Sequence, residues 1–414
     1  MSFRRRFAKI SSAAQRTFAG YSAAIIDYRL LVPLLINSVL FQIVITLARL
    51  MTSYRALELH LSVILLGAIA ATFALLPVFL AVWVGRFIDR GNDAVAAWIG
   101  SGVLAVACCG FVLYPSPIGL VAWTALLGVG QLLMMAAQQM LCVRVASREW
   151  LDHVFGNYLV AASIGQALGP LMVGWVGGSA KLPPTKALFV VSLIAAVAAF
   201  LIALTIRPKH QTARNSEVRD KVPLKSLLSL PGLNAVIVAG ICIITAQDLI
   251  IIYFPILGAE RTIPVDAIST LLIVRAGFAI ASRLVYARFV TAFGHDPLMV
   301  CCTFAAALSF AAIAAPMPLW AMYIAMAIMG FALGAAMTLS ITMVVARTPA
   351  NARATANSLR IMGNRIGQVS LPFGASLMAA STGVAGILVL IALSLAASAA
   401  AVRLTQPVQV RATA

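Results

Sequence analysis

The residues most able to do chemistry in this sequence are two opposite charges set deep inside apolar segments. Asp248 lies about nine residues before the end of the segment 232–257, and Arg275 lies about eleven residues after the start of the segment 264–286. At a rise of about 1.5 Å per residue, two antiparallel helices would bring these side chains to nearly the same depth. Either charge alone is costly in a low-dielectric interior. The sequence therefore predicts an Asp248–Arg275 ion pair.

Two kinds of role are open to this pair. It can be a static structural link, or Asp248 can take up a proton while Arg275 exchanges its partner for an anionic ligand. Arg360 and Arg365 also lie within an apolar segment. Each is predicted either to extend to the membrane surface or to face a cavity and attract a carboxylate or phosphate. Arg49, near the end of the first apolar segment, is predicted to anchor at the membrane interface.

Neutral polar side chains at similar depth are further binding candidates. The first apolar segment contains Asn37 and Gln42, and the segment 117–142 places Gln131 and Gln138 at helical spacing on one face. Such amides can bind neighbouring helices together or line a wet cavity. We expect the cavity wall, because an amide is awkward against hydrocarbon.

A stretch rich in glycine, from residue 164 to residue 174, indicates a helix that packs closely and bends. Small residues let membrane helices approach one another, and proline is tolerated there because neighbours satisfy the freed backbone groups. Part of the stretch recurs at an offset of 202 residues, where Ile-Gly-Gln is repeated and a proline follows at the matching position. The repeat predicts that the chain arose by duplication. The residues predicted to serve packing and conformational change here are Gly165, Gly169, Pro170, Gly174, Gly367 and Pro372.

The composition assigns the chain to the membrane. Hydrophobic residues make up 62% of it and charged residues 10%, whereas an ordinary soluble domain is about 25% charged. Twelve apolar segments are long enough to cross about 30 Å of hydrocarbon. They lie near residues 30–50, 61–84, 94–114, 117–142, 155–177, 186–206, 232–257, 264–286, 297–315, 319–346, 355–380 and 382–402.

The formal charge of +18 predicts an orientation rather than a nucleic-acid partner. If both termini are cytoplasmic, most of the Lys and Arg residues fall on the cytoplasmic side, as the positive-inside rule requires. The predicted outer side then holds only Arg49, Arg55, Lys181, Lys186 and Arg261. The six cysteines lie in apolar segments without metal-ligand spacing, so we expect neither a disulfide framework nor a metal site. We predict a multi-pass protein of the cell inner membrane.

The predicted organisation is two six-helix bundles joined by the one long polar loop. The basic tail 1–29 precedes the first bundle, 30–206; a cytoplasmic loop, 207–231, leads to the second bundle, 232–403, and a short tail, 404–414. We expect the two bundles to act as one unit with a cleft between them.

This arrangement resembles the major facilitator superfamily, and the loop after the second span supports the resemblance. Gly85, Asp89 and Arg90 match the family's signature, although Asn92 and Asp93 stand where basic residues are expected. The resemblance implies an all-α fold of two bundles related by a pseudo-twofold axis, with a cavity lined by the first, fourth, seventh and tenth spans. It also implies a gating role for the signature loop. We expect the Asp89 carboxylate to accept from the amides at another helix start, near Thr355.

The glycine-proline stretch also resembles that of the family's drug and proton antiporters. The first functional hypothesis is therefore a monomeric secondary transporter that exports a small organic compound by alternating access, driven by a proton gradient with Asp248 as the proton carrier. Uptake of an organic anion is the alternative, favoured by Arg275, Arg360 and Arg365. A transporter-like sensor without flux is a third. The sequence contains no nucleotide, metallopeptidase or nucleophile motif, so we expect neither an enzyme nor a cofactor.

Overall fold

The computed structural model describes residues 27–145, 151–178, 180, 182–207, 230, 232–348 and 353–405. The first half contains α2 (Tyr28–Glu58), α3 (Val63–Asp89), α4 (Asp93–Leu113), α5 (Pro117–Val145), α6 (Leu151–Gly177) and α7 (Thr185–Thr205). The second half contains α9 (Leu233–Glu260), α10 (Val265–Phe293), α11 (His295–Ala314), α12 (Leu319–Ala346) and α13 (Arg353–Leu404). For the first ten predicted segments these bounds agree to within eight residues, the largest differences being at the ends of α2 and α10.

Local signals fix where several helices begin. Asp27 caps α2 by accepting from the Arg29 amide, and Ser62 caps α3 by accepting from the Leu65 amide. Pro117 is the first residue of α5, a position that needs no amide donor. Asp266 and Asp296 lie in the first turns of α10 and α11. A carboxylate there stabilises the helix, because it interacts favourably with the positive end of the helix dipole.

Eleven helices within the described residues are long and apolar enough to cross a membrane. The predicted spans 355–380 and 382–402 both fall inside α13, which is not straight: Gly383 leaves the helical conformation at φ 66° and ψ −168°. Glycine adopts this left-handed φ without steric cost. Divided at Gly383, the described part of the chain has twelve helical segments, in agreement with the predicted number.

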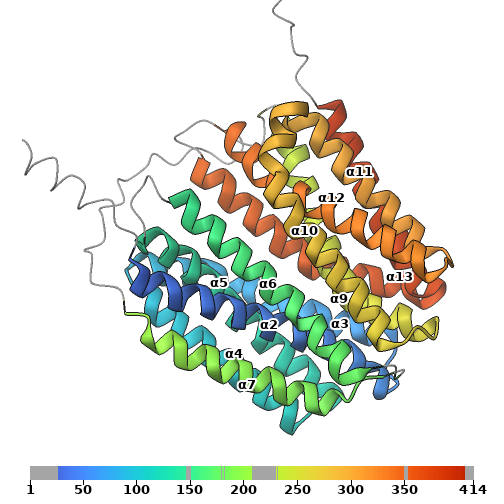
Figure 1. The fold of residues 1–414 in the computed structure, drawn as a ribbon, viewed down its shortest axis with the longest axis horizontal. Helices are drawn as coiled ribbons and strands as arrows, with labels where there is room; N and C mark the ends of the chain where they lie inside the picture. Colours follow the sequence, from blue (N-terminus) through green and yellow to red (C-terminus); the bar gives the residue numbers. More distant parts are fainter. Residues whose placement is uncertain are drawn as a thin grey trace, which may run out of the picture.

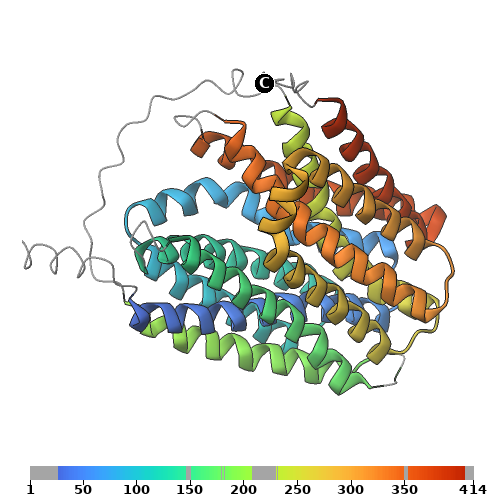
Figure 2. The same ribbon diagram turned by 45° about the horizontal axis from the view of Figure 1, so that its top comes forward.

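The helices form two groups that lie side by side (Figure 1), and a view turned by 45° keeps them so (Figure 2). In the first group α2 packs on α6 and α7, and α5 packs on α3 and α4. In the second group α9 and α11 pack on α13, and α10 packs on α12. The groups meet where α3 contacts α13, α6 contacts α10 and α2 contacts α9. The predicted tails and the loop 207–231 lie largely outside the described residues.

The two groups are joined by backbone hydrogen bonds at the side where α6 ends and α10 begins. The Val265 amide donates to the Ala180 carbonyl at 3.1 Å, and the Asp266 amide donates to the Gly178 carbonyl at 2.9 Å. Close packing supports this contact, because Gly174 lies against Ser269 and Gly177 lies against Val265. This side of the boundary between the halves is therefore closed.

Candidate functional site

The central ionic contact joins the two halves, and it is not the predicted one. Arg49 Nη1 on α2 lies 2.6 Å from Asp248 Oδ1 on α9, and their side chains are 8% and 16% exposed. Among the described residues, no ion pair joins Asp248 to Arg275. Two predictions were therefore wrong, namely the Asp248–Arg275 pair and the placement of Arg49 at the membrane interface. Equal depth on neighbouring helices does not fix the direction of a side chain, and Asp248 points toward α2.

The second carboxylate oxygen of Asp248 reaches a third helix. Gln368 Nε2 on α13 donates to Asp248 Oδ2 at 2.6 Å. Arg365 Nη1 then donates to Gln368 Oε1 at 3.1 Å. Gln368 was not among the predicted site residues, although it belongs to the repeated Ile-Gly-Gln, the signal by which it could have been found. The four side chains form a chain of contacts across α2, α9 and α13.

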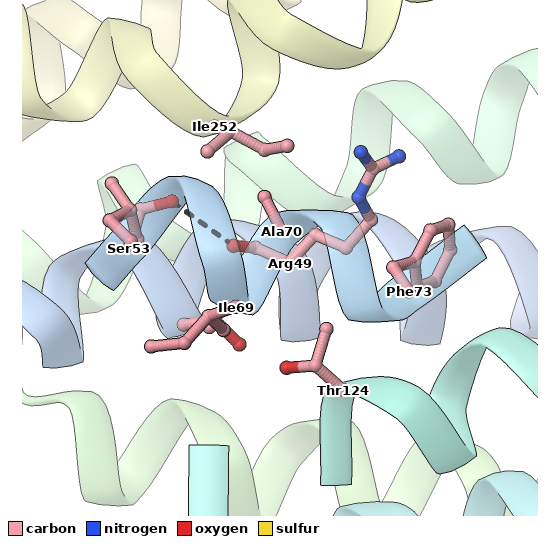
Figure 3. Close-up of a pocket in the computed structure, with 9 residues that line it drawn as sticks. Arg49, Ser53, Ile69, Ala70, Phe73, Thr124 and Ile252 are labelled. Atoms are coloured by element: carbon pink, nitrogen blue, oxygen red, sulfur yellow. Dashed lines mark hydrogen bonds between the residues drawn. The ribbon is translucent and has the colours of Figure 1, made fainter. Parts of the chain in front are cut away.

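The Arg49 side chain lies in a largely apolar setting. Its guanidinium carbon is 4.4 Å from the centre of the Phe73 ring, a cation–π contact. Figure 3 shows this ring beside the guanidinium, with Ile252 of α9 approaching from the side opposite Thr124. An ion pair is stronger beside apolar groups than in water, because the local dielectric is low. The surroundings thus strengthen the link between the halves.

A second, polar pocket lies between the halves next to α10. Its lining contains Gln166 and Ser163 from α6, Gln247 from α9, and Arg275 and Arg283 from α10. Arg275 is 8% exposed, and its Nε atom is buried without a hydrogen-bond partner. Arg283 donates through Nη1 to the Ser163 hydroxyl and, at 3.4 Å, to the Leu159 carbonyl. Two cations therefore line this pocket, whereas the lining includes no Asp or Glu.

The close approach of α12 shapes the same pocket. Gly330 and Gly334 line it, and a Cβ atom at Gly330 would collide with the backbone of Arg275. Glycine at this position lets α12 lie directly against α10. Gln247 donates to the Leu333 carbonyl at 3.3 Å, which ties α9 to the same wall.

The amide candidates of the first half take two different positions. Asn37 donates to the Ala199 carbonyl at 2.7 Å and accepts from Gln138 at 2.8 Å, and both side chains are fully buried. This placement favours the helix-packing alternative for these two residues. Gln42 is partly exposed and accepts from Gln166, a pocket residue, at 3.4 Å. Gln131 is also partly exposed, and its Oε1 atom is buried without a partner.

The remaining arginine candidates are buried. Arg360 is 6% exposed and Arg365 is 7% exposed. Neither extends to the surface, so the predicted alternative in which one of them does is not seen for either. Arg365 joins the Asp248 contacts through Gln368.

The glycine stretch performs the close packing predicted for it. Gly165 lies against Val39 and Gln42 of α2, and Gly169 lies against Thr46. In the second half Gly367 lies against Ile241 and Thr245 of α9. Val39 and Ile241 are 202 residues apart, which is also the spacing of Gly165 and Gly367. Pro170 lies inside α6, and the side chain of Pro372 is outside the described residues.

The helix that follows the signature loop begins with a buried acid other than the predicted one. The Asp89 side chain lies outside the described residues, so its expected contact with the helix start near Thr355 stays a prediction. Gly85 has open space around it, and Arg90 is exposed. Asp93 Oδ2 is 2.5 Å from Arg144 Nε at the end of α5, and the Asp93 side chain is fully buried. The residue that departs from the signature thus forms an ion pair of its own.

Comparisons with known proteins agree with this architecture. The family model described as Major Facilitator Superfamily matches residues 17–260 and, a second time, residues 236–413. The nucleoside transporter NupG superposes with a TM-score of 0.71 at 14% identity, covering 91% of this chain and 98% of that one. A POT family transporter in complex with a thioalcohol-conjugated peptide gives 0.73 at 11% identity, covering 90% and 95%. A bacterial homolog of the human lysosomal transporter Spinster, in an inward-facing and occupied conformation, gives 0.68 at 14% identity, covering 91% and 96%.

A comparison with curated protein sequences finds no match. At these identities the solved structures speak to the fold alone. The family model, by contrast, covers nearly the whole chain in two overlapping matches, one for each half. The protein therefore belongs to the major facilitator superfamily, which identifies it as a membrane transporter rather than an enzyme.

Proposed function

We propose that this protein is a secondary transporter that carries a small organic anion across the membrane by alternating access. The observation that supports the anion most directly is the pocket containing Arg275, a buried cation without a carboxylate beside it in the pocket lining. Of the twelve Asp and Glu residues, Asp248 alone lies in the middle of a predicted span, and its carboxylate is already engaged by Arg49 and Gln368. An anionic substrate would compensate the remaining charge.

The contacts between the halves support alternating access. Among the described residues they include the two backbone hydrogen bonds at Ala180 and Gly178, the Arg49–Asp248 pair and the Arg283–Ser163 contact. Each is a discrete link that a rocking motion of one half against the other can break and reform. The substrate would be released or taken up at one face while such links hold the other face closed.

Transport by purified protein in liposomes tests the proposal. Replacing Arg275 with Gln should lower the affinity for a carboxylate by about 10-fold or more, because a charge-assisted hydrogen bond is lost. Neutral compounds should bind as before. The matched control is Arg288→Gln, on the exposed surface of the same helix, which should leave carboxylate uptake unchanged. If no anion is bound or transported by the intact protein, the proposal fails.

Proton-coupled export is a second candidate function. It is favoured by the packing of Gly165 and Gly169 against α2, which gives α6 the close contact expected of an antiporter-like fifth span. In this case Asp248 would take up the proton. Asp248→Asn should then abolish flux driven by a proton gradient and spare substrate exchange, whereas unchanged driven flux would remove Asp248 from the coupling.

The proposed orientation places both termini in the cytoplasm of a cell with this protein in its inner membrane. Accessibility tags at Ser116 and Pro183 should react from outside, and a tag at Ser216 should react only from the cytoplasm. A cytoplasmic tag at either of the first two positions would contradict the orientation.

A further inference from the structure

The two cations of the polar pocket lie at different levels of the same helix. Arg275 and Arg283 are eight residues apart on α10, or about 12 Å along the helix axis. Both line the pocket. We propose that the transported anion carries two separate acidic groups, one held by Arg275 and the other by Arg283. This inference rests on the proposed function, since it specifies the anion that the same pocket takes.

Arg275 forms no ion pair with Asp248, although the Asp248 charge still acts on it at longer range. Asp248 uses one oxygen for Arg49 and the other for Gln368. The Nε atom of Arg275 is buried and has no hydrogen-bond partner. A buried polar donor without a partner is costly, and a charged one more so. In this structure the pocket has a volume of only about 10 Å³, room for a water-sized group. A carboxylate would satisfy the Nε atom in a state in which the two halves have moved apart around the pocket.

Arg283 offers the second position. Its contacts with Ser163 and Leu159 run through Nη1 and reach neutral oxygens, which accept hydrogen bonds but do not cancel the charge. A guanidinium has five N–H donors in a fixed fork, so the Nε and Nη2 groups remain suited to a second acidic group. The Ser163 contact holds the side chain in place and thereby reduces the entropy lost on binding.

The other polar residues of the pocket match the middle of such a ligand. Gln166 on α6 and Gln247 on α9 line the pocket on other helices, and both are neutral. Amides can bond to hydroxyl or carbonyl groups between the two acidic ends. A ligand with one negative charge would leave one guanidinium uncompensated, either the buried Arg275 or the partly buried Arg283, whereas a ligand with two would compensate both.

Binding to the purified full-length protein tests the inference. The probes are the α,ω-dicarboxylates from succinate to suberate, the half-amide of each, and monocarboxylates of the same lengths. The best dicarboxylate should bind about 10-fold to 100-fold more tightly than its half-amide, as expected for one charge-assisted contact. Arg283→Gln should remove this preference while the half-amide keeps its affinity. Arg283→Lys, which retains the charge, should keep much of the preference, and Arg288→Gln should keep all of it.

The outcomes separate the two proposals. If monocarboxylates bind as tightly as dicarboxylates, the anion proposal stands and the two-group inference is overturned. A preference for phosphate monoesters that survives Arg283→Gln would also overturn it, because one acidic group at Arg275 would then suffice. Absence of binding by every anion would refute the proposed function itself. Elution of each variant as a single peak in size-exclusion chromatography separates loss of binding from loss of folding.

Discussion

The two halves of the protein share their outer construction and differ at their centre. In the first half Asp93 at the start of α4 pairs with Arg144 at the end of α5. In the second half Asp296 at the start of α11 pairs with Arg347 at the end of α12, also at 2.5 Å. The two pairs are 203 residues apart at both members, close to the spacing of the repeated glycine contacts. Corresponding contacts therefore hold each bundle together, as expected for the predicted duplication.

The centre has lost this equivalence. At the offset of 202 residues, Asp248 corresponds to Thr46, Arg275 to Phe73 and Arg365 to Ser163. The second half thus bears charges where the first half has neutral side chains, and two of those neutral residues contact arginines: Phe73 faces Arg49 and Ser163 accepts from Arg283. The comparison teaches that packing constrains both copies alike, whereas the charged groups at the centre differ between the copies: Arg49 in the first, and Asp248, Arg275 and Arg365 in the second.

Breaking the central Arg49–Asp248 pair should cause the largest loss of stability. Asp248→Asn should destabilise the protein by about 3–5 kcal/mol, because Arg49 is left buried without its charged partner. The substitution Thr46→Val, at the corresponding position of the first half, should cost less than about 1 kcal/mol, because it leaves no buried charge without a partner. Thermal unfolding in detergent measures both. Equal shifts in the melting temperature of the two variants would contradict the assignment of the central carboxylate, Asp248, to the second half.

Breaking the two peripheral ion pairs, Asp93–Arg144 and Asp296–Arg347, should cause smaller and unequal losses of stability. The Asp93 side chain is fully buried, whereas that of Asp296 is 29% exposed. Asp93→Asn should therefore cost about 3 kcal/mol, as for a broken buried pair. Asp296→Asn should cost about 1 kcal/mol, as for a partly solvated pair. The same unfolding assay decides the order, and a larger loss at Asp296 would show that burial does not control these pairs.

Alanine substitutions at the repeated glycine contacts should cause the smallest losses of stability. A Cβ atom at Gly165 would meet the backbone of Val39, whereas one at Gly367 would meet the Ile241 side chain, which can move. Gly165→Ala should cost about 2 kcal/mol and Gly367→Ala about 1 kcal/mol. Gly156 has open space around it, so Gly156→Ala is the control and should not lower the melting temperature. If Gly156→Ala lowers the melting temperature as much as Gly165→Ala does, the effect comes from the helix backbone rather than from packing.

Much of the fold could be predicted from residue pattern, and much of the site could not. The predicted segment 117–142 corresponds to α5, and the repeated sequence at Gly165 and Gly367 correctly predicted close contacts between helices. Asp248 was identified as a central residue, but its partner was not. A helical rise converts sequence separation into depth, whereas the face of α9 that meets α2 depends on how the two bundles dock.

The sequence by itself determined that this chain crosses a membrane as paired six-helix groups, because apolar length and small-residue spacing are properties of each segment alone. Only the tertiary structure decided that Arg49 rather than Arg275 neutralises Asp248. It also decided that Arg275 and Arg283 share one pocket with Gln166. Arg49 and Gln166 come from the first half, whereas the residues they meet come from the second. Their meeting therefore depends on the packing between the halves, which no local pattern encodes.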